Sequence, residues 1–374
     1  MICIAEGCLK GTPGIRDNLT VLFVPNWYIR AYFRSVLYGI VAATTALLLA
    51  AVLTALLRTP ALRLGILDRR RQRPVPLSGG PALALTTCLV AAAGDWTGAA
   101  PLGAGVGELL VAGAAVAALG LVADVRRVKA RVLVAGTAVA AACVVPYAET
   151  GVVGGVLAVG WIVFVAVGFW ALDHADALAG TVGVVTAFGV GACVAAEVMD
   201  GLAVLLSVLA AALTGFLMHN WHPARVALGA SGSLFTGFVL AAAAVVARTG
   251  HGLASSAGVL FALTAVASAD VVLVLMSRRF AGRPLLRGGP DHLAHRLRRL
   301  GLTPQGAILL LGLGAFSSVL VGVLVHLGWV AESGVFWVGA VALVAVFALL
   351  RVSVYGARRP PSTQVGGRLR VRNG

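Results

Sequence analysis

Charged side chains are scarce in this 374-residue sequence: Asp, Glu, Lys and Arg make up 11% of it, whereas 60% of the residues are hydrophobic. A soluble domain does not carry so large an apolar fraction. Uncharged apolar stretches of about 20 residues recur, and a helix needs that length to cross a bilayer. The short alternating segments of a membrane β-barrel are absent. The sequence therefore predicts an all-α, polytopic helical membrane protein.

Cysteines and signal-peptide features are also sparse. The five cysteines show no metal-like spacing, and the three in apolar segments are interpreted as small core residues; the five are Cys3, Cys8, Cys88, Cys143 and Cys193. Residues 1–33 lack the charged start, apolar run and small-residue site of a cleavable signal. We therefore predict an N-terminal extension over residues 1–34.

Eleven apolar segments are candidates for membrane spans, and several are short and rich in Gly and Ala, which predicts close helix packing. The segments cover residues 35–57, 78–93, 102–122, 132–147, 152–169, 181–198, 202–218, 233–247, 255–276, 305–329 and 335–350. One membrane domain over residues 35–352 follows from them. The Gly-, Pro- and Arg-rich tail, residues 353–374, is predicted to be disordered.

The net charge of +15 would suit a nucleic-acid partner, but the placement of the charges argues against one. Arg and Lys cluster in alternate short loops, as the positive-inside rule requires. This bias predicts a plasma-membrane protein with its C-terminus in the cytoplasm. The same loops could attract anionic lipid headgroups or phosphorylated substrates.

Four loops on the predicted cytoplasmic side carry clusters of polar residues: three combine acids with histidines or arginines, and residues 218–233 carry histidines and an arginine. They are "LGLVADVRRVKAR" (119–131), "FWALDHADALAG" (169–180), "MHNWHPARVALGASGS" (218–233) and "RRFAGRPLLRGGPDHLAHRLRRLGLT" (278–303). Polar groups at the face of a membrane bundle need partners, so this gathering predicts a shared cytoplasmic-side cleft.

Four stretches of the chain resemble the polyprenyl-phosphate N-acetylhexosamine-1-phosphate transferase family, also known as glycosyltransferase family 4. They are residues 67–85, residues 223–238, Asp270 with the residues after it, and residues 291–311. The match covers about residues 37 to 352 and includes the eleven-span layout of one branch. The resemblance implies transfer of a phospho-sugar from a UDP-amino sugar to undecaprenyl phosphate or another polyprenyl phosphate, with Mg²⁺ and release of UMP. Such chemistry needs carboxylates for the cation and cationic or His donors for the diphosphate.

The sequence departs from the family pattern at the aspartates. Ala123 and Asp124 stand where the family has two adjacent aspartates, and Ala230 replaces the metal-binding aspartate of a Gly-Asp-x-Gly-Ser turn. After the fifth segment Asp173 and Asp176 remain. Val167 and Trp170 replace family asparagines, and His174 and Ala177 replace family glycines; in the family's triple-histidine motif only the central residue differs, as Ala294.

The resemblance implies roles for the residues that remain. Asp124, Asp173 and Asp176 are the predicted catalytic residues, and Asp173 and Asp176 are also the predicted Mg²⁺ ligands. The predicted diphosphate-binding residues are His292, His295, Arg296, Gly232 and Ser233.

Several alternatives stay open. The lost carboxylates suit a non-catalytic protein that binds a lipid carrier, or a scaffold of envelope synthesis, with a second copy or a synthesis enzyme as partner. The spaced histidines suit a Zn²⁺ site; they are His174, His219, His222, His292 and His295. A transporter is the third alternative, although only Glu108 and Asp270 are acids within apolar segments.

Overall fold

Helices dominate the computed structural model, which describes residues 26–68, 74–126, 128–284, 289 and 291–354. The prediction of an all-α membrane protein is confirmed. The elements are α1 (Asn26–Arg63), β1 (Leu67–Asp68), β2 (Val75–Pro76), α2 (Gly79–Trp96), α3 (Ala104–Val125), α4 (Ala130–Val144), α5 (Tyr147–Leu172), α6 (Leu178–Ala196), α7 (Asp200–Asn220), α8 (Gly229–Ala247), α9 (Leu253–Leu263), α10 (Ala265–Phe280), α11 (Leu293–Arg299), α12 (Pro304–His326) and α13 (Gly334–Leu350). Helix α1 begins inside the predicted N-terminal extension, while residues 1–25 and most of the predicted tail lie outside the described residues.

The predicted count of eleven spans is not confirmed. Within the described ranges, seven helices are long and apolar enough to cross a membrane, and the bent pair α9 and α10 makes an eighth if it is one span. Helices α4 and α13 are apolar but shorter. The chain is therefore a multi-pass membrane protein, with seven or eight spans by length and composition.

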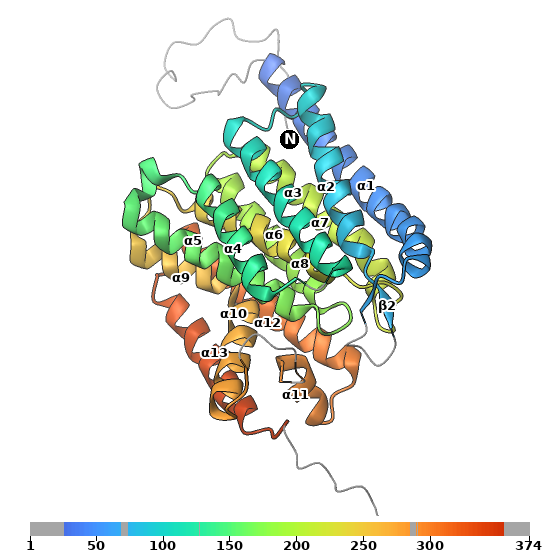
Figure 1. The fold of residues 1–374 in the computed structure, drawn as a ribbon. Coiled ribbons are helices and arrows are strands. Elements are labelled where there is room, and N and C mark those ends of the chain that lie inside the picture. The colour runs from blue at the N-terminus through green and yellow to red at the C-terminus, as the bar shows by residue number, and fades with distance from the viewer. Residues whose placement is uncertain (1–25, 69–73, 127, 285–288, 290, 355–374) are drawn as a thin grey trace, which may run out of the picture.

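Helix α8 forms the centre of the bundle, with 94% of its apolar window buried, and α2, α3, α5 and α6 pack around it (Figure 1). Small residues permit this packing. A Cβ on Gly80 of α2 would overlap the backbone of Gly232, and one on Gly120 of α3 would lie 2.6 Å from the Ala230 carbonyl oxygen. Helix α8 is thus buried because small residues let the backbones of its neighbours approach it closely.

The eighth apolar segment was expected to begin at Ser233, but α8 begins at Gly229. Gly229 has a φ of +72°, which glycine adopts without strain. The small-residue turn expected from the sequence is therefore the first turn of a helix. Its backbone N–H groups point toward the loops that follow α3 and α5.

The ninth apolar segment, expected to be continuous, breaks at Thr264 into α9 and α10, which are bent by 85°. The break leaves the Leu263 carbonyl outside the helical ladder, and the Thr186 hydroxyl of α6 donates to it at 3.3 Å. Irregular backbone inside a membrane bundle requires such a partner. As a result α10 turns toward the end of the bundle that carries α11 (Figure 1).

Replacing Gly80 by Ala tests the close approach of α2 and α8. The added methyl group overlaps backbone atoms, which cannot move aside as a flexible side chain would, so we expect a loss of about 3 kcal/mol of stability. Gly107→Ala on α3 is the control, because a Cβ there meets nothing within 4 Å. Thermal unfolding in detergent measures both variants, and equal melting temperatures would contradict this packing.

Candidate substrate site at the start of α8

Two carboxylates hold the N-terminus of α8. Asp124, at the end of α3, accepts from the backbone N–H groups of Ala230 at 2.9 Å and Ser231 at 3.0 Å. Asp173, directly after α5, accepts from the Gly229 N–H at 2.8 Å. The first turn of a helix has N–H groups without helical partners and a partial positive charge, so a carboxylate binds strongly there. Two of the predicted catalytic residues thus lie together, as caps of α8.

Asp176, the third predicted catalytic residue, binds the loop between α7 and α8. One of its carboxylate oxygens lies 2.8 Å from Nδ1 of His222 and accepts from the Ala224 N–H at 3.1 Å. Nearby, Asn220 accepts from the N–H of Ala177 at 2.8 Å. Ala177 has a φ of 57°, so a residue that replaces a family glycine keeps a glycine-like backbone with the help of this bond.

Gly232 and Ser233, two predicted diphosphate-binding residues, are buried in helix packing. Gly232 contacts the backbone of Gly80, and the Ser233 hydroxyl donates to the carbonyl of Gly229. Both residues are fully enclosed by protein. A diphosphate would reach them only if α2 and α8 moved apart.

Arg296, predicted to bind a diphosphate, is instead a buried connection between three helices. It is 1% exposed, and its guanidinium donates to protein acceptors on every side. Those acceptors are the Ser277 hydroxyl of α10 and the carbonyls of Asp291, Leu349, Leu350 and Val352. The structure therefore gives Arg296 a positioning role: it fastens α11 to α10 and to the end of α13.

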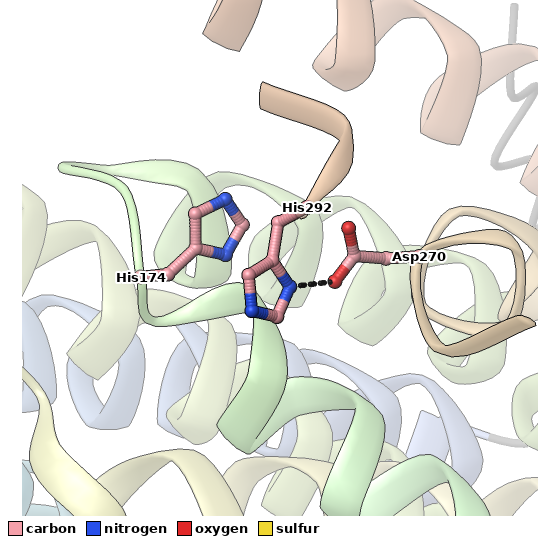
Figure 2. Close-up of side chains that lie close together, drawn as sticks. All are labelled: His174, Asp270 and His292. Atoms are coloured by element: carbon pink, nitrogen blue, oxygen red, sulfur yellow. Dashed lines mark hydrogen bonds and ion pairs between the residues drawn. The ribbon is translucent and has the colours of Figure 1, made fainter. Parts of the chain in front are cut away.

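His174, His292 and Asp270 lie close together beside this point (Figure 2), and His295 lies near the two histidine rings. Asp270 of α10 lies 2.8 Å from Nδ1 of His292 and accepts from the Leu293 N–H at 2.7 Å. The ring of His174 stacks on that of His292, with centroids 4.1 Å apart, and lies 4.8 Å from the ring of His295. The predicted residues His292 and His295 are thus brought together, with His174 between them.

Sequence reasoning gave no site role to Asp270 and considered His174 only as a zinc ligand. An acid in an apolar segment was the available signal for Asp270, because such a group needs a partner. The signal for His174 was its replacement of a glycine that the family keeps next to Asp173. Neither signal identifies the contact with His292, which depends on the bend between α9 and α10.

Two of these histidines, His174 and His295, have lowered pKa values. Burial, reinforced by the neighbouring His292 and Arg298, lowers the pKa of His295 to about 4. Burial and His292 also hold the pKa of His174 well below its ordinary value. Nδ1 of His174 lies 2.7 Å from the Ala171 carbonyl and so carries the proton. Its Nε2 is buried and has no hydrogen-bond partner among the described residues.

Known proteins resemble this chain along most of its length. A model of the family described as glycosyl transferase family 4 matches residues 107–248, from α3 to the end of α8. A Streptomyces coelicolor protein, named provisionally as a glycosyltransferase, is 65% identical over 329 residues, which cover 87% of this chain and 80% of the relative. The chain belongs to glycosyltransferase family 4. The resemblance inferred from the sequence motifs is thereby confirmed.

More distant members of glycosyltransferase family 4 have named reactions. A Mycolicibacterium smegmatis protein named decaprenyl-phosphate N-acetylglucosaminephosphotransferase is 29% identical over 316 residues, covering 71% of this chain and 77% of the relative. A Picosynechococcus protein named phospho-N-acetylmuramoyl-pentapeptide-transferase is 34% identical over 147 residues, covering 38% of this chain and 40% of the relative. The first name joins a decaprenyl phosphate to the transfer of phospho-N-acetylglucosamine, and the second names the transfer of a phospho-N-acetylmuramoyl-pentapeptide.

The Mg²⁺ expected from the family does not fit the side chains at the start of α8. Among the described residues, two clusters offer three ligand atoms within 4.8 Å of one another, and neither contains Asp124, Asp173 or Asp176. Those carboxylates hold backbone N–H groups, and Ala230 supplies no oxygen. Mg²⁺ prefers several oxygen ligands in a near-octahedral arrangement. No step of a reaction is therefore assigned to a metal here.

For zinc, the alternative metal, His174, Asp270 and His292 offer ligand atoms within 4.8 Å of one another. The rings of His174 and His292 are stacked with 17° between their planes, an unfavourable arrangement for two imidazoles that bind one ion. His222 is held by Asp176, away from this stack. The histidine pairs recognised in the sequence thus belong to separate parts of the site.

Asp124→Ala removes two bonds from the start of α8. Two buried N–H groups then lose their acceptor, and we expect a loss of about 2–4 kcal/mol of stability, measured by thermal unfolding in detergent. Asp124→Asn, which keeps one carbonyl oxygen, should lie between the native protein and the Ala variant. A native-like melting temperature for Asp124→Ala would show that the cap is unimportant.

In the His295→Asn variant, the free energy of unfolding should decrease less as the pH falls than in the native protein. The folded-state pKa of about 4 lies below the ordinary value near 6.5, so the unfolded chain binds more protons between these values. Stability is therefore lost as the pH falls from about 6.5 toward 4. From pH 7 to pH 5 the native protein should lose about 1–2 kcal/mol more than the variant. Melting curves at the two pH values test this, and parallel losses would refute it.

Proposed function

We propose that this family member binds a polyprenyl-phosphate carrier without carrying out the Mg²⁺-dependent transfer of a phospho-sugar from a UDP-amino sugar. The proposal is based on the residues at the family's metal-binding position. Ala230 has no side-chain atom that could bind a metal, and Asp124 and Asp173 accept hydrogen bonds from backbone N–H groups of α8. We further propose that the site faces the cytoplasm at the plasma membrane, with a second copy or an enzyme of envelope synthesis as partner.

The chemistry explains why this loss matters. In the family reaction, a lipid phosphate attacks the diphosphate of a nucleotide sugar, so two anions must approach each other. A divalent cation offsets their repulsion and contributes several kcal/mol of charge stabilisation in the transition state. Because each 1.4 kcal/mol is about tenfold in rate, losing the cation slows the transfer by several powers of ten. The carboxylates lost here are at Ala123 and Ala230.

Binding of the lipid phosphate does not require the same cation. His292 and His295 keep their family positions, and Asp270 orients His292. The relatives named as decaprenyl-phosphate transferases support a polyprenyl phosphate as the ligand class. A site that retains its phosphate-binding imidazoles but lacks its metal ligands supports binding better than transfer.

A rebuilt transferase is the second candidate, because of the pair formed by His222 and Asp176. The carboxylate fixes Nδ1 of His222, and the His222 side chain is 33% exposed. Its Nε2 is then an oriented proton acceptor close to the start of α8, as in a general base. This candidate requires turnover by the native chain.

The deciding measurement is UMP release by the detergent-purified protein with Mg²⁺, undecaprenyl phosphate and a panel of UDP-amino sugars. We expect no release from the native chain and measurable release from the Ala123→Asp, Ala230→Asp double variant, which restores both family carboxylates. Binding of undecaprenyl phosphate by the native chain in nanodiscs is measured alongside.

Two results would overturn the proposal. Release by the native chain, abolished by His222→Asn and by Asp173→Ala, would establish the rebuilt transferase. If the native chain does not bind undecaprenyl phosphate, the proposal that it binds a lipid carrier is wrong.

A further inference from the structure

The end of the bundle where α10, α11 and α13 meet is strongly basic (Figure 1). The buried guanidinium of Arg296 joins these helices there, since it donates both to the Ser277 hydroxyl and to the Leu349 carbonyl. Four exposed arginines lie within three residues of Ser277, Arg296 or Leu349; they are Arg279, Arg298, Arg299 and Arg351.

None of the exposed acids among the described residues lies at this end. They lie near the ends of α2 and α6, at the starts of α3, α5 and α7, and between α12 and α13. These acids are Asp95, Glu108, Glu149, Glu197, Asp200 and Glu332. The arginines around Arg296 therefore attract anions without competition from an exposed carboxylate beside them.

An apolar surface adjoins these arginines. An open pocket at the last turns of α10 is lined by Leu275, Met276, Arg279 and Phe280. On α13, the exposed Phe347 lies four residues before Arg351, which is about 6 Å along the helix. Apolar side chains followed within one turn by arginines mark the level at which the hydrocarbon of a bilayer gives way to headgroups.

We propose that the end of α10 binds an anionic phospholipid of the surrounding bilayer. The lipid phosphate lies at Arg279, with the charge of Arg351 added from the neighbouring end of α13. An acyl chain of the same lipid lies against Leu275, Met276 and Phe280. The proposed ligand is thus a bilayer lipid and not the polyprenyl-phosphate carrier.

The direction of Arg279 favours a bilayer lipid over the carrier. Its neighbour Arg278 is 6% exposed and forms a two-bonded ion pair with Asp291, which directly precedes His292. Successive residues of an α-helix lie about 100° apart around its axis. The face of α10 that carries Arg279 is therefore not the face that holds α11, and a phosphate at Arg279 lies away from His292.

The chemistry of the pocket matches both parts of such a lipid. A guanidinium donates two parallel hydrogen bonds to a phosphate, which a zwitterionic lipid also offers, but net negative charge distinguishes the anionic lipid. An arginine near an anionic lipid surface contributes about fivefold in affinity. The two arginines together should therefore give a preference for anionic lipid of at least tenfold.

Native mass spectrometry of the full-length protein in detergent tests the proposal, because it resolves each bound lipid and gives the dissociation constant of the first one. The probes are dioleoyl phosphatidylglycerol, which is anionic, and dioleoyl phosphatidylcholine, which has no net charge. We expect the native chain to bind the anionic lipid at least tenfold more tightly. Equal constants overturn the proposal without any variant.

Two pairs of variants locate the site. The Arg279→Gln, Arg351→Gln double variant should lose most of the preference for the anionic lipid. Its control is Arg126→Gln, Arg131→Gln, which removes two exposed positive charges before and at the start of α4 and should keep the preference.

The apolar part has its own pair. Phe280→Ala should weaken binding of phosphatidylglycerol at least threefold, whereas Phe188→Ala, which removes an equally exposed ring from α6, should not. All these side chains are exposed, so melting temperatures without added lipid should stay within a few degrees of the native value.

The remaining outcomes separate this inference from the proposed function. Equal losses in the two arginine double variants overturn it, because the preference then reflects only the total charge of the basic end. One-for-one displacement of phosphatidylglycerol by undecaprenyl phosphate also overturns it, in favour of a carrier site at α10. Absence of undecaprenyl-phosphate binding, with the preference for phosphatidylglycerol intact, overturns the proposed function and leaves this inference standing.

Discussion

The rest of the site depends on the bond between two carboxylates and the first turn of α8. Helix α8 is almost wholly buried, so its initial N–H groups cannot be satisfied by water and need acceptors from the protein. Asp124 and Asp173 supply them from the ends of α3 and α5. This arrangement fixes where the loops after these helices meet, and therefore where His174, the neighbour of Asp173, can lie.

The substitution at Ala230 and this cap are physically connected. A third carboxylate at the start of α8 would add negative charge beside Asp124 and Asp173, and a divalent cation would be needed to offset the repulsion. With alanine there, the partial positive charge of the helix N-terminus acts on the two carboxylates that remain. The same residues therefore serve as helix caps in this chain where the family pattern implies metal ligands.

Much of the fold could be predicted because a bilayer imposes simple rules on composition, and each of the eleven apolar segments overlaps at least one described helix. The break at Thr264 could not be predicted, because the acceptor it exposes, the Leu263 carbonyl, accepts from Thr186, 77 positions earlier. The role of Arg296 could not be predicted either, because its acceptors include carbonyls at the end of α13, more than 50 residues away. For the site, the family motifs identified the loops that meet at the start of α8. They could not identify the hydrogen-bond partners of each side chain, because those partners are set by tertiary contacts.

Those partners decide what is left for a ligand. Asp124 and Asp173 bind amides, Asp176 binds a histidine and an amide, and Arg296 binds carbonyls and a hydroxyl. A guanidinium whose N–H groups already bond to protein acceptors has little capacity left to donate to an anion. The residues that the resemblance identified thus already act within the fold, as caps of α8 and as bonds between helices and loops.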